Sequence, residues 1–180
     1  AVEFAILTAC RSGEVRGAKW TEFDTAGKVW TIPAERMKAK REHEVPLSDA
    51  ALALLESMPK VGEIVFAGTK KQILSDMSLT AVIRRMNGDD KPVWADANGE
   101  GVTVHGFRSS FRMWAAETTN YPREVAEHAL AHQLPDAVER AYQRGSQFAK
   151  RAALMAEWSA YCATVQTDAV VKQIRGATQR

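Results

Sequence analysis

Between residues 20 and 47 large and polar side chains alternate, whereas most of the remaining chain spaces its apolar residues as helices do. Residues 29–32 (Val-Trp-Thr-Ile) and 43–47 predict two strands, and residues 20–23 predict a further β segment. The charged segment AERMKAKRE lies between the two strands and predicts the exposed end of a hairpin. This pattern restricts the chain to a mainly α fold with a small antiparallel β-sheet near the N-terminus.

Serine and proline residues mark where helices are expected to begin. Ser12, Ser48 and Ser78 suit the N-cap position, and Pro122 and Pro135 suit the first turn. Outside the sheet we expect one more strand, over 64–66. Helices are expected over residues 1–9, 49–58, 78–86, 105–118, 122–130, 147–161 and 167–174. Two further helices are expected to begin near residues 13 and 135. A small β region is therefore followed by a mostly helical body.

The composition is that of a globular chain of about one domain. Hydrophobic residues make up 46% and charged residues 26% of its 180 residues, which excludes a disordered chain, a collagen or a disulfide scaffold. No apolar run approaches the roughly 18 residues that a membrane span requires. The net charge of +2 neither demands nor excludes a nucleic acid partner, so the positions of the cations matter more than their number.

The two cysteines and the first residues bear on cellular context. Cys10 and Cys162 suit no zinc or disulfide pattern and are interpreted as reduced cytosolic thiols. No signal peptide is visible, and the chain begins with AVEFAILTAC, which is apolar and lacks Met. We therefore expect a fragment of a longer protein.

The positions of two cationic residues in the sequence are explained neither by a buried core nor by an ordinary exposed surface. Arg11 follows an apolar helix, and because an unpaired buried charge is costly it must pair with Glu14 or face an anion. Lys38 lies in Arg-Met-Lys-Ala-Lys-Arg, where four cations repel one another unless an anion is near. The alternative is a solvated turn whose flanking glutamates offset the charge.

His105 and Arg108 are three residues apart at the start of a predicted helix. A helix N-terminus attracts anions, so a cation pair there indicates a phosphate site; the alternative is a capping histidine and a surface arginine. His128 and His132 are four apart, but Ala129 occupies the position where a zinc protease needs Glu, which disfavours a metal site. One histidine is expected to be structural and the other to face the site.

These residues, taken in order, resemble the catalytic domain of the tyrosine recombinases (the phage integrase family), in particular the integrases of satellite phages and genomic islands. The matching positions are Arg11 and Glu14 in TACRSGE, Lys38 in MKAKREHEVPLS, His105 and Arg108 in HGFRSSFRMWAAE, Leu130-Ala131-His132, and Tyr142 ten residues later. Ala9 and Ala131 replace two glycines of the family pattern, and Lys40 rivals Lys38. The N-terminal DNA-binding region that the family normally carries is not among these residues, as we expect of a fragment.

The resemblance implies a site-specific recombinase that cleaves and rejoins DNA through a covalent 3′-phosphotyrosine, without metal, ATP or another cofactor. By itself a tyrosine on a helix is more often a packing residue. The implied roles are phosphate-binding cations for Arg11 and Arg108, a donor for His132, an acid or base for His105, an acid on the leaving 5′-oxygen for Lys38, and the nucleophile for Tyr142.

The resemblance also implies partners and a domain plan. Double-stranded DNA carrying attachment sites, further protomers in a synaptic tetramer, and an excisionase or host DNA-bending proteins are expected partners; a membrane is not, and the expected location is cytoplasmic, with the nucleoid. The plan is a catalytic domain over 1–180, with a core over 1–145 and a helical tail over 146–180. Expected phosphate contacts are Arg36, Lys40, Arg41, Arg84, Arg85 and Arg112.

Two other functions fit part of this pattern. A type IB topoisomerase-like relaxase uses similar chemistry, although it generally carries a longer enclosing clamp. A decayed integrase that only binds DNA would keep the fold, but the loss of one catalytic residue would suffice for decay and all six are present. An SDS-resistant adduct with DNA separates both enzymes from the remnant.

Overall fold

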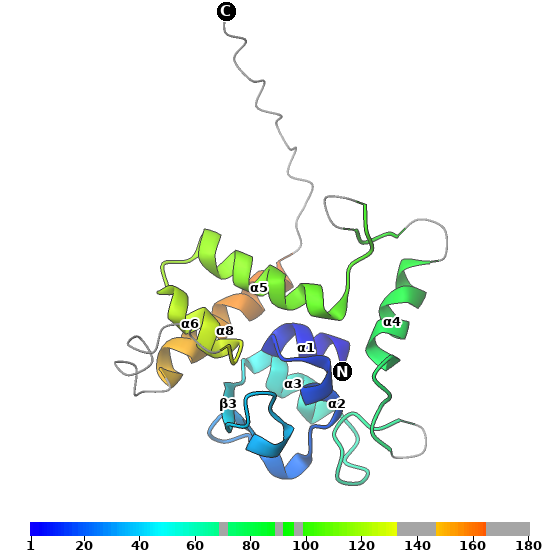
Figure 1. Cartoon of the computed structure of the whole chain (residues 1–180). Helices are drawn as coiled ribbons and strands as arrows, with labels where there is room; N and C mark the ends of the chain where they lie inside the picture. Colours follow the sequence, from blue (N-terminus) through cyan, green and yellow to red (C-terminus); the bar gives the residue numbers. More distant parts are fainter. Residues whose placement is uncertain (69–71, 89–91, 96–98, 133–146, 165–180) are drawn as a thin grey trace, which may run out of the picture.

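The computed structural model describes residues 1–68, 72–88, 92–95, 99–132 and 147–164 (Figure 1). Over these residues it confirms a mainly helical fold with one small antiparallel sheet. None of the helices within these ranges combines the length and hydropathy of a membrane span. The helices are α1 (Val2–Thr8), α2 (Ser12–Arg16), α3 (Asp49–Ser57), α4 (Ser78–Asn87), α5 (Val104–Thr118), α6 (Arg123–Ala129) and α8 (Phe148–Ala163), with the 3₁₀ turns η1 (Trp20–Glu22) and η2 (Ala34–Arg36).

The sheet has three strands in the order β1-β2-β3, all antiparallel. They are β1 (Phe23–Asp24), β2 (Val29–Ile32) and β3 (His43–Pro46). Trp30 and Ile32, two residues apart on β2, are fully buried, as the period of two of a strand requires. The predicted hairpin of β2 and β3 is confirmed, and η2 lies in the connection between these strands.

Helix α1 contributes side chains to both hydrophobic clusters of the described residues, and it lies between α3 and the group of α5, α6 and α8 (Figure 1). On one side Phe4 packs against Trp30, with ring centroids 5.5 Å apart, in the cluster that holds the sheet and α3. On the other side the carbonyl of Ile6 accepts a hydrogen bond of 2.8 Å from the indole N–H of Trp158, on α8. The C-terminal end of α1 is therefore placed where both clusters meet.

The second cluster joins α5, α6 and α8 through aromatic side chains. Trp158 lies 5.4 Å from Phe111 and 5.2 Å from Trp114, measured between ring centroids, and Phe111 is fully buried. Aromatic pairs in this range stabilise by about 0.5–1.5 kcal/mol beyond their burial. This packing fixes α5, which carries the expected catalytic residues His105 and Arg108, against α1.

Several local expectations were wrong. Residues 64–66 form no strand: Ile64 makes one isolated bridge, to Lys19, because the facing segment turns away into η1. Residues 20–22 are a 3₁₀ turn, so the first strand begins only at Phe23. Ser12 and Ser78 are the first helical residues and not the caps. The helices expected from 135 and over 167–174 lie outside the described residues.

Candidate active site

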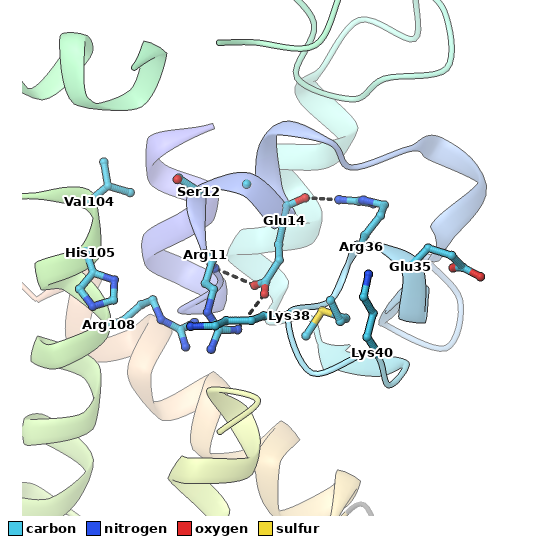
Figure 2. A pocket seen from close by; sticks show the side chains of 12 residues that line it. Arg11, Ser12, Glu14, Glu35, Arg36, Lys38, Lys40, Val104, His105 and Arg108 are labelled. Atoms are coloured by element: carbon cyan, nitrogen blue, oxygen red, sulfur yellow. Dashed lines mark hydrogen bonds and ion pairs between the residues drawn. The ribbon is translucent and has the colours of Figure 1, made fainter. Parts of the chain in front are cut away.

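A pocket of about 570 Å³ opens between the start of α2, the η2 connection and the start of α5 (Figure 2). Five arginine or lysine side chains line it against two glutamates, so the lining is cationic. The lining residues are Arg11, Ser12, Gly13, Glu14, Glu35, Arg36, Met37, Lys38, Lys40, Val104, His105 and Arg108. A concave surface of one charge sign concentrates ligands of the other sign, here anions.

Arg11 enters the pocket from the turn between α1 and α2, where it is the N-cap of α2. Both its backbone N–H and its Nη1 donate to the carboxylate of Glu14, each at 2.8 Å. The Glu14 side chain is 5% exposed and that of Arg11 is 30% exposed. Both alternatives predicted for Arg11 are therefore compatible with the structure, because it pairs with Glu14 and its guanidinium also faces the cationic pocket.

Arg108 lies on α5 and is only 5% exposed. Its guanidinium donates to the carbonyls of Ala9 (through Nη1) and Leu130 (through Nη2, 2.7 Å), which are the ends of α1 and α6. Burial and the neighbouring Arg11 hold the pKa of Arg108 below its usual value, but a guanidinium stays charged at any working pH. One arginine thus ties three helices together at the pocket.

His105 lies one turn before Arg108 on α5, is exposed and lines the same pocket. The hydroxyl of Thr103 caps this helix by accepting a 3.0 Å hydrogen bond from the N–H of Gly106. The positive end of the helix dipole and the guanidinium groups of Arg11 and Arg108 repel one another. An anion in the pocket would relieve that repulsion.

His132 joins the site through Arg108. Its Nε2 lies 3.3 Å from Nη2 of Arg108, and its Nδ1 lies 2.6 Å from a carboxylate oxygen of Glu127, on α6. Sequence reasoning missed Glu127, although a carboxylate among the apolar positions of a predicted helix is a usable signal. Within the described ranges no group of three or more His, Cys, Asp or Glu side chains is arranged to hold a metal ion.

The two lysine candidates lie in the connection after η2, and both are exposed. Figure 2 shows Lys38 pointing toward the guanidinium groups of Arg11 and Arg108, whereas Lys40 points toward Arg36. The segment is not simply a solvated turn, because Met37, next to Lys38, is 2% exposed.

Arg36 anchors the lysine-bearing segment at its base. Its guanidinium donates to the carboxylate of Glu22 and to the backbone carbonyl of Glu14, and its side chain is 20% exposed. The same carboxylate accepts the indole N–H of Trp30 at 2.9 Å. Arg36 therefore connects the sheet to α2 beside Arg11.

The other expected DNA contacts do not line this pocket. Arg84 and Arg85 lie on the exposed side of α4, and Arg112, on α5, pairs through Nε with Glu127 at 2.7 Å. Arg41 is exposed after the lysine segment. Tyr142 lies outside the described residues, so its role as nucleophile stays a prediction.

Solved structures share this fold. The crystal structure of XerA recombinase aligns with a TM-score of 0.53 at 15% identity, over 79% of this chain and 58% of that one. A lambda integrase dimer bound to a COC′ core site aligns with a TM-score of 0.54 at 23% identity, over 74% of this chain and 49% of that one. At these identities the likeness establishes the fold.

Sequence relatives extend the comparison. Prophage integrase IntA of Escherichia coli K12 is 34% identical over 92% of this chain and 39% of its own length. The integrase of Enterobacteria phage P4 is 32% identical over 88% of this chain and 38% of its own length. The chain thus spans about two fifths of these relatives. The pattern described as the phage integrase family matches residues 1–147, and this chain therefore belongs to the phage integrase family.

Proposed function

We propose that this chain is the catalytic domain of a site-specific DNA recombinase, which integrates or excises a mobile element by cleaving and rejoining DNA. The observation that carries the proposal is one cationic pocket in which Arg11, Arg108 and Lys38 meet. These residues are 97 positions apart at their extremes in the sequence. The chemistry of that pocket and the family membership together support the whole recombinase reaction.

The reaction is an in-line attack on a DNA phosphodiester. The hydroxyl oxygen of Tyr142 forms a bond to phosphorus while the bond from phosphorus to the 5′-oxygen breaks. Negative charge grows on the two non-bridging oxygens, and the guanidiniums of Arg11 and Arg108 offer forked donors for them. Removing one such preorganised donor typically lowers the rate about 10²–10³-fold.

Two protons move in this step. His105 accepts the phenol proton of Tyr142, and Lys38 gives a proton to the leaving 5′-oxygen. The product is a 3′-phosphotyrosine and a free 5′-hydroxyl, so the energy of the phosphodiester is kept in the covalent bond. Attack by a 5′-hydroxyl of another strand reverses the step and joins new partners without ATP.

Double-stranded DNA is the proposed substrate, and further copies of the chain are the proposed partners. The lambda integrase structure holds a dimer on a core site, and strand exchange between two duplexes needs four active sites, hence a synaptic tetramer. Residues 1–145 would form the catalytic core and 146–180 a helical tail. Arg41, Arg84 and Arg85 are exposed enough to contact phosphates, and an excisionase or host DNA-bending proteins would set direction.

The test is a suicide duplex carrying the attachment site with a nick beside the cleavage point, so that the released fragment diffuses away. We expect a protein–DNA adduct that survives SDS with the wild-type chain and is absent with Tyr142→Phe. Tyr121→Phe is the matched control, since the Tyr121 hydroxyl only donates to Glu157 (2.7 Å). An adduct that persists in Tyr142→Phe reassigns the nucleophile.

The same assay separates the alternatives. A DNA-binding remnant would shift the duplex in a gel without any adduct. A relaxase would relax supercoiled plasmids that lack the attachment site, whereas a recombinase requires it. EDTA should leave adduct formation intact, because the proposal assigns the charge on phosphate to arginines, and strict dependence on Mg²⁺ would overturn that assignment.

A further inference from the structure

Glu127 is a buried carboxylate with a partner on each oxygen. The residue is 6% exposed, whereas the side chain of His132 is 38% exposed. One oxygen lies 2.6 Å from Nδ1 of His132, and the other accepts from Nε of Arg112 at 2.7 Å. Such a burial needs a reason, because a carboxylate placed in the interior loses its hydration.

The backbone holds His132 to the same residue. The N–H of His132 donates to the carbonyl of Glu127 at 2.9 Å, and that of Ala131 donates to His128 at 3.0 Å. Ala131 has φ 51°, so α6 ends in the double hydrogen-bond pattern of a Schellman motif. His132 is therefore positioned by Glu127 through both main chain and side chain.

The charge state of Glu127 decides which nitrogen of His132 carries a proton. Burial raises the pKa of this carboxyl, but hydrogen bonds from His132 and Arg112 outweigh burial and hold it below its usual value. An ionised carboxylate only accepts hydrogen bonds, so Nδ1 must be the protonated nitrogen. Nε2 is then the atom left to face Arg108, 3.3 Å away.

We infer that Glu127 is a positioning residue for the recombinase reaction: it holds His132 as the Nδ1–H form, so that Nε2 accepts from Arg108 and keeps that guanidinium aimed at the phosphate. The consequence for catalysis rests on the proposed function, whereas the tautomer rests on the hydrogen bonds of His132 and on the ionised state of Glu127. A carboxylate that orients a histidine in this way is a general device for fixing tautomer and direction. The competing role is a purely structural link, Arg112 to Glu127, that joins α5 to α6.

The test is ¹⁵N NMR of the histidine rings in the whole chain at alkaline pH, with His132 assigned from the signals that His132→Gln removes. In the wild type we expect the Nδ1–H form. In Glu127→Gln an amide can offer either its oxygen or its nitrogen to the ring, so the Nε2–H form should gain population. The wild-type spectrum alone is decisive: an Nε2–H form for His132 overturns the inference even when the variant does not fold.

Arg112→Gln is the matched control, since it removes the link between α5 and α6 but keeps the carboxylate. It should leave the His132 ring signals in the Nδ1–H form; equal changes in both variants support a structural link only and overturn the inference. In the adduct assay Glu127→Gln should lower the cleavage rate about 10- to 100-fold with unchanged DNA affinity, and an unchanged rate contradicts the positioning role. A wild type without adduct formation would refute the recombinase function while the ring spectrum still tests the tautomer.

Discussion

Arg108 and Lys38 line the same pocket, but they are held in opposite ways. Arg108 is 5% exposed and donates to the ends of two other helices, so the fold itself places it. Lys38 is exposed, and its ammonium group has no ion pair with the described residues; only its neighbours Met37 and Arg36 are anchored. The side of the pocket that we propose binds phosphate is therefore preorganised, whereas the side that we propose carries the general acid is anchored only through the residues before Lys38.

Function and stability are coupled on the arginine side of the pocket and separate on the lysine side. A preorganised donor stabilises a growing charge without having to reorganise during the reaction, and burial supplies that rigidity. A proton donor has only to reach the leaving oxygen once DNA is bound. Substitutions on the arginine side should therefore affect folding and catalysis together, and substitutions at the lysines should affect catalysis alone.

The largest effect is expected from Arg108→Ala. Two buried carbonyls, of Ala9 and Leu130, lose their donor, and each unsatisfied buried group costs about 1–3 kcal/mol. The free energy of unfolding, measured in denaturant, should fall by about 2–5 kcal/mol, and adduct formation should be lost. Arg112→Ala, one turn later on α5, should cost less, about 1–2 kcal/mol, because Arg112 is half-exposed and the Glu127 carboxylate keeps His132 as a partner. Equal stability of both variants would contradict the anchoring role of Arg108.

The second largest effect is expected at acid pH, where the folded chain should lose stability through His43 on β3. Burial and the nearby Arg151 lower the pKa of His43 from 6.5 to about 4, and Glu14 and Arg108 also act on it. Because the folded chain resists protonation, this contribution to stability is complete above pH 6.5 and is lost as the pH falls toward 4. The loss should reach about 3 kcal/mol, at about 1.4 kcal/mol for each pH unit.

The control for this prediction is His43→Gln, which removes the titrating ring. Denaturant unfolding at several pH values between 7 and 4 should give a shallower slope for the variant than for the wild type. Identical slopes would show that His43 does not couple protonation to folding.

Lys38→Ala should leave the free energy of unfolding within about 0.5 kcal/mol of the wild type, as surface substitutions usually do. Cleavage should slow about 10²-fold, a barrier change of about 2.7 kcal/mol. A substrate with sulfur at the leaving 5′ position should restore the rate, because a thiolate leaves without a proton. Lys40→Ala is the matched control, and a larger loss there would transfer the acid role to Lys40.

The smallest effect concerns the two alanines that replace glycines of the family pattern. Ala9 and Ala131 both have φ 51°, a conformation that costs a residue with a Cβ about 1–2 kcal/mol. Ala131→Gly should therefore raise the free energy of unfolding by about 1 kcal/mol or less, since glycine loses more entropy on folding. Ala116→Gly, on the exposed side of α5, should lower it by about 1 kcal/mol; the same sign for both would be contrary to this account.

Much of the fold was predictable because its signals are local. Ser48 caps α3 as expected, accepting from the N–H of Ala51 at 3.3 Å, and the apolar spacing of α5 and α8 matches their buried faces. The strand expected at Ile64 was wrong because a short apolar run does not reveal whether a partner strand exists. The burial of Met37 was not predicted, because the residues around it in the sequence are charged and indicate an exposed segment.

The site was predictable as a set of residues but not as a geometry. Arg11, Arg108 and His132 could be selected from their order in the chain, yet nothing local indicates that Arg108 binds the carbonyls of Ala9 and Leu130. Those contacts span 99 and 22 residues of sequence and exist only once both clusters have packed. The positive φ of Ala131 and the partners of its neighbours likewise follow from tertiary structure.

The most direct test of the central claim is a crystal structure of the chain on attachment-site DNA, with vanadate in place of the scissile phosphate. Vanadate adopts the five-coordinate geometry of the proposed transition state. We predict equatorial oxygens within hydrogen-bond distance of Arg11 and Arg108, and the hydroxyl oxygen of Tyr142 at an apical position. Vanadate bound elsewhere on the surface, or another side chain at the apical position, would contradict the assignment of this pocket as the site of strand cleavage.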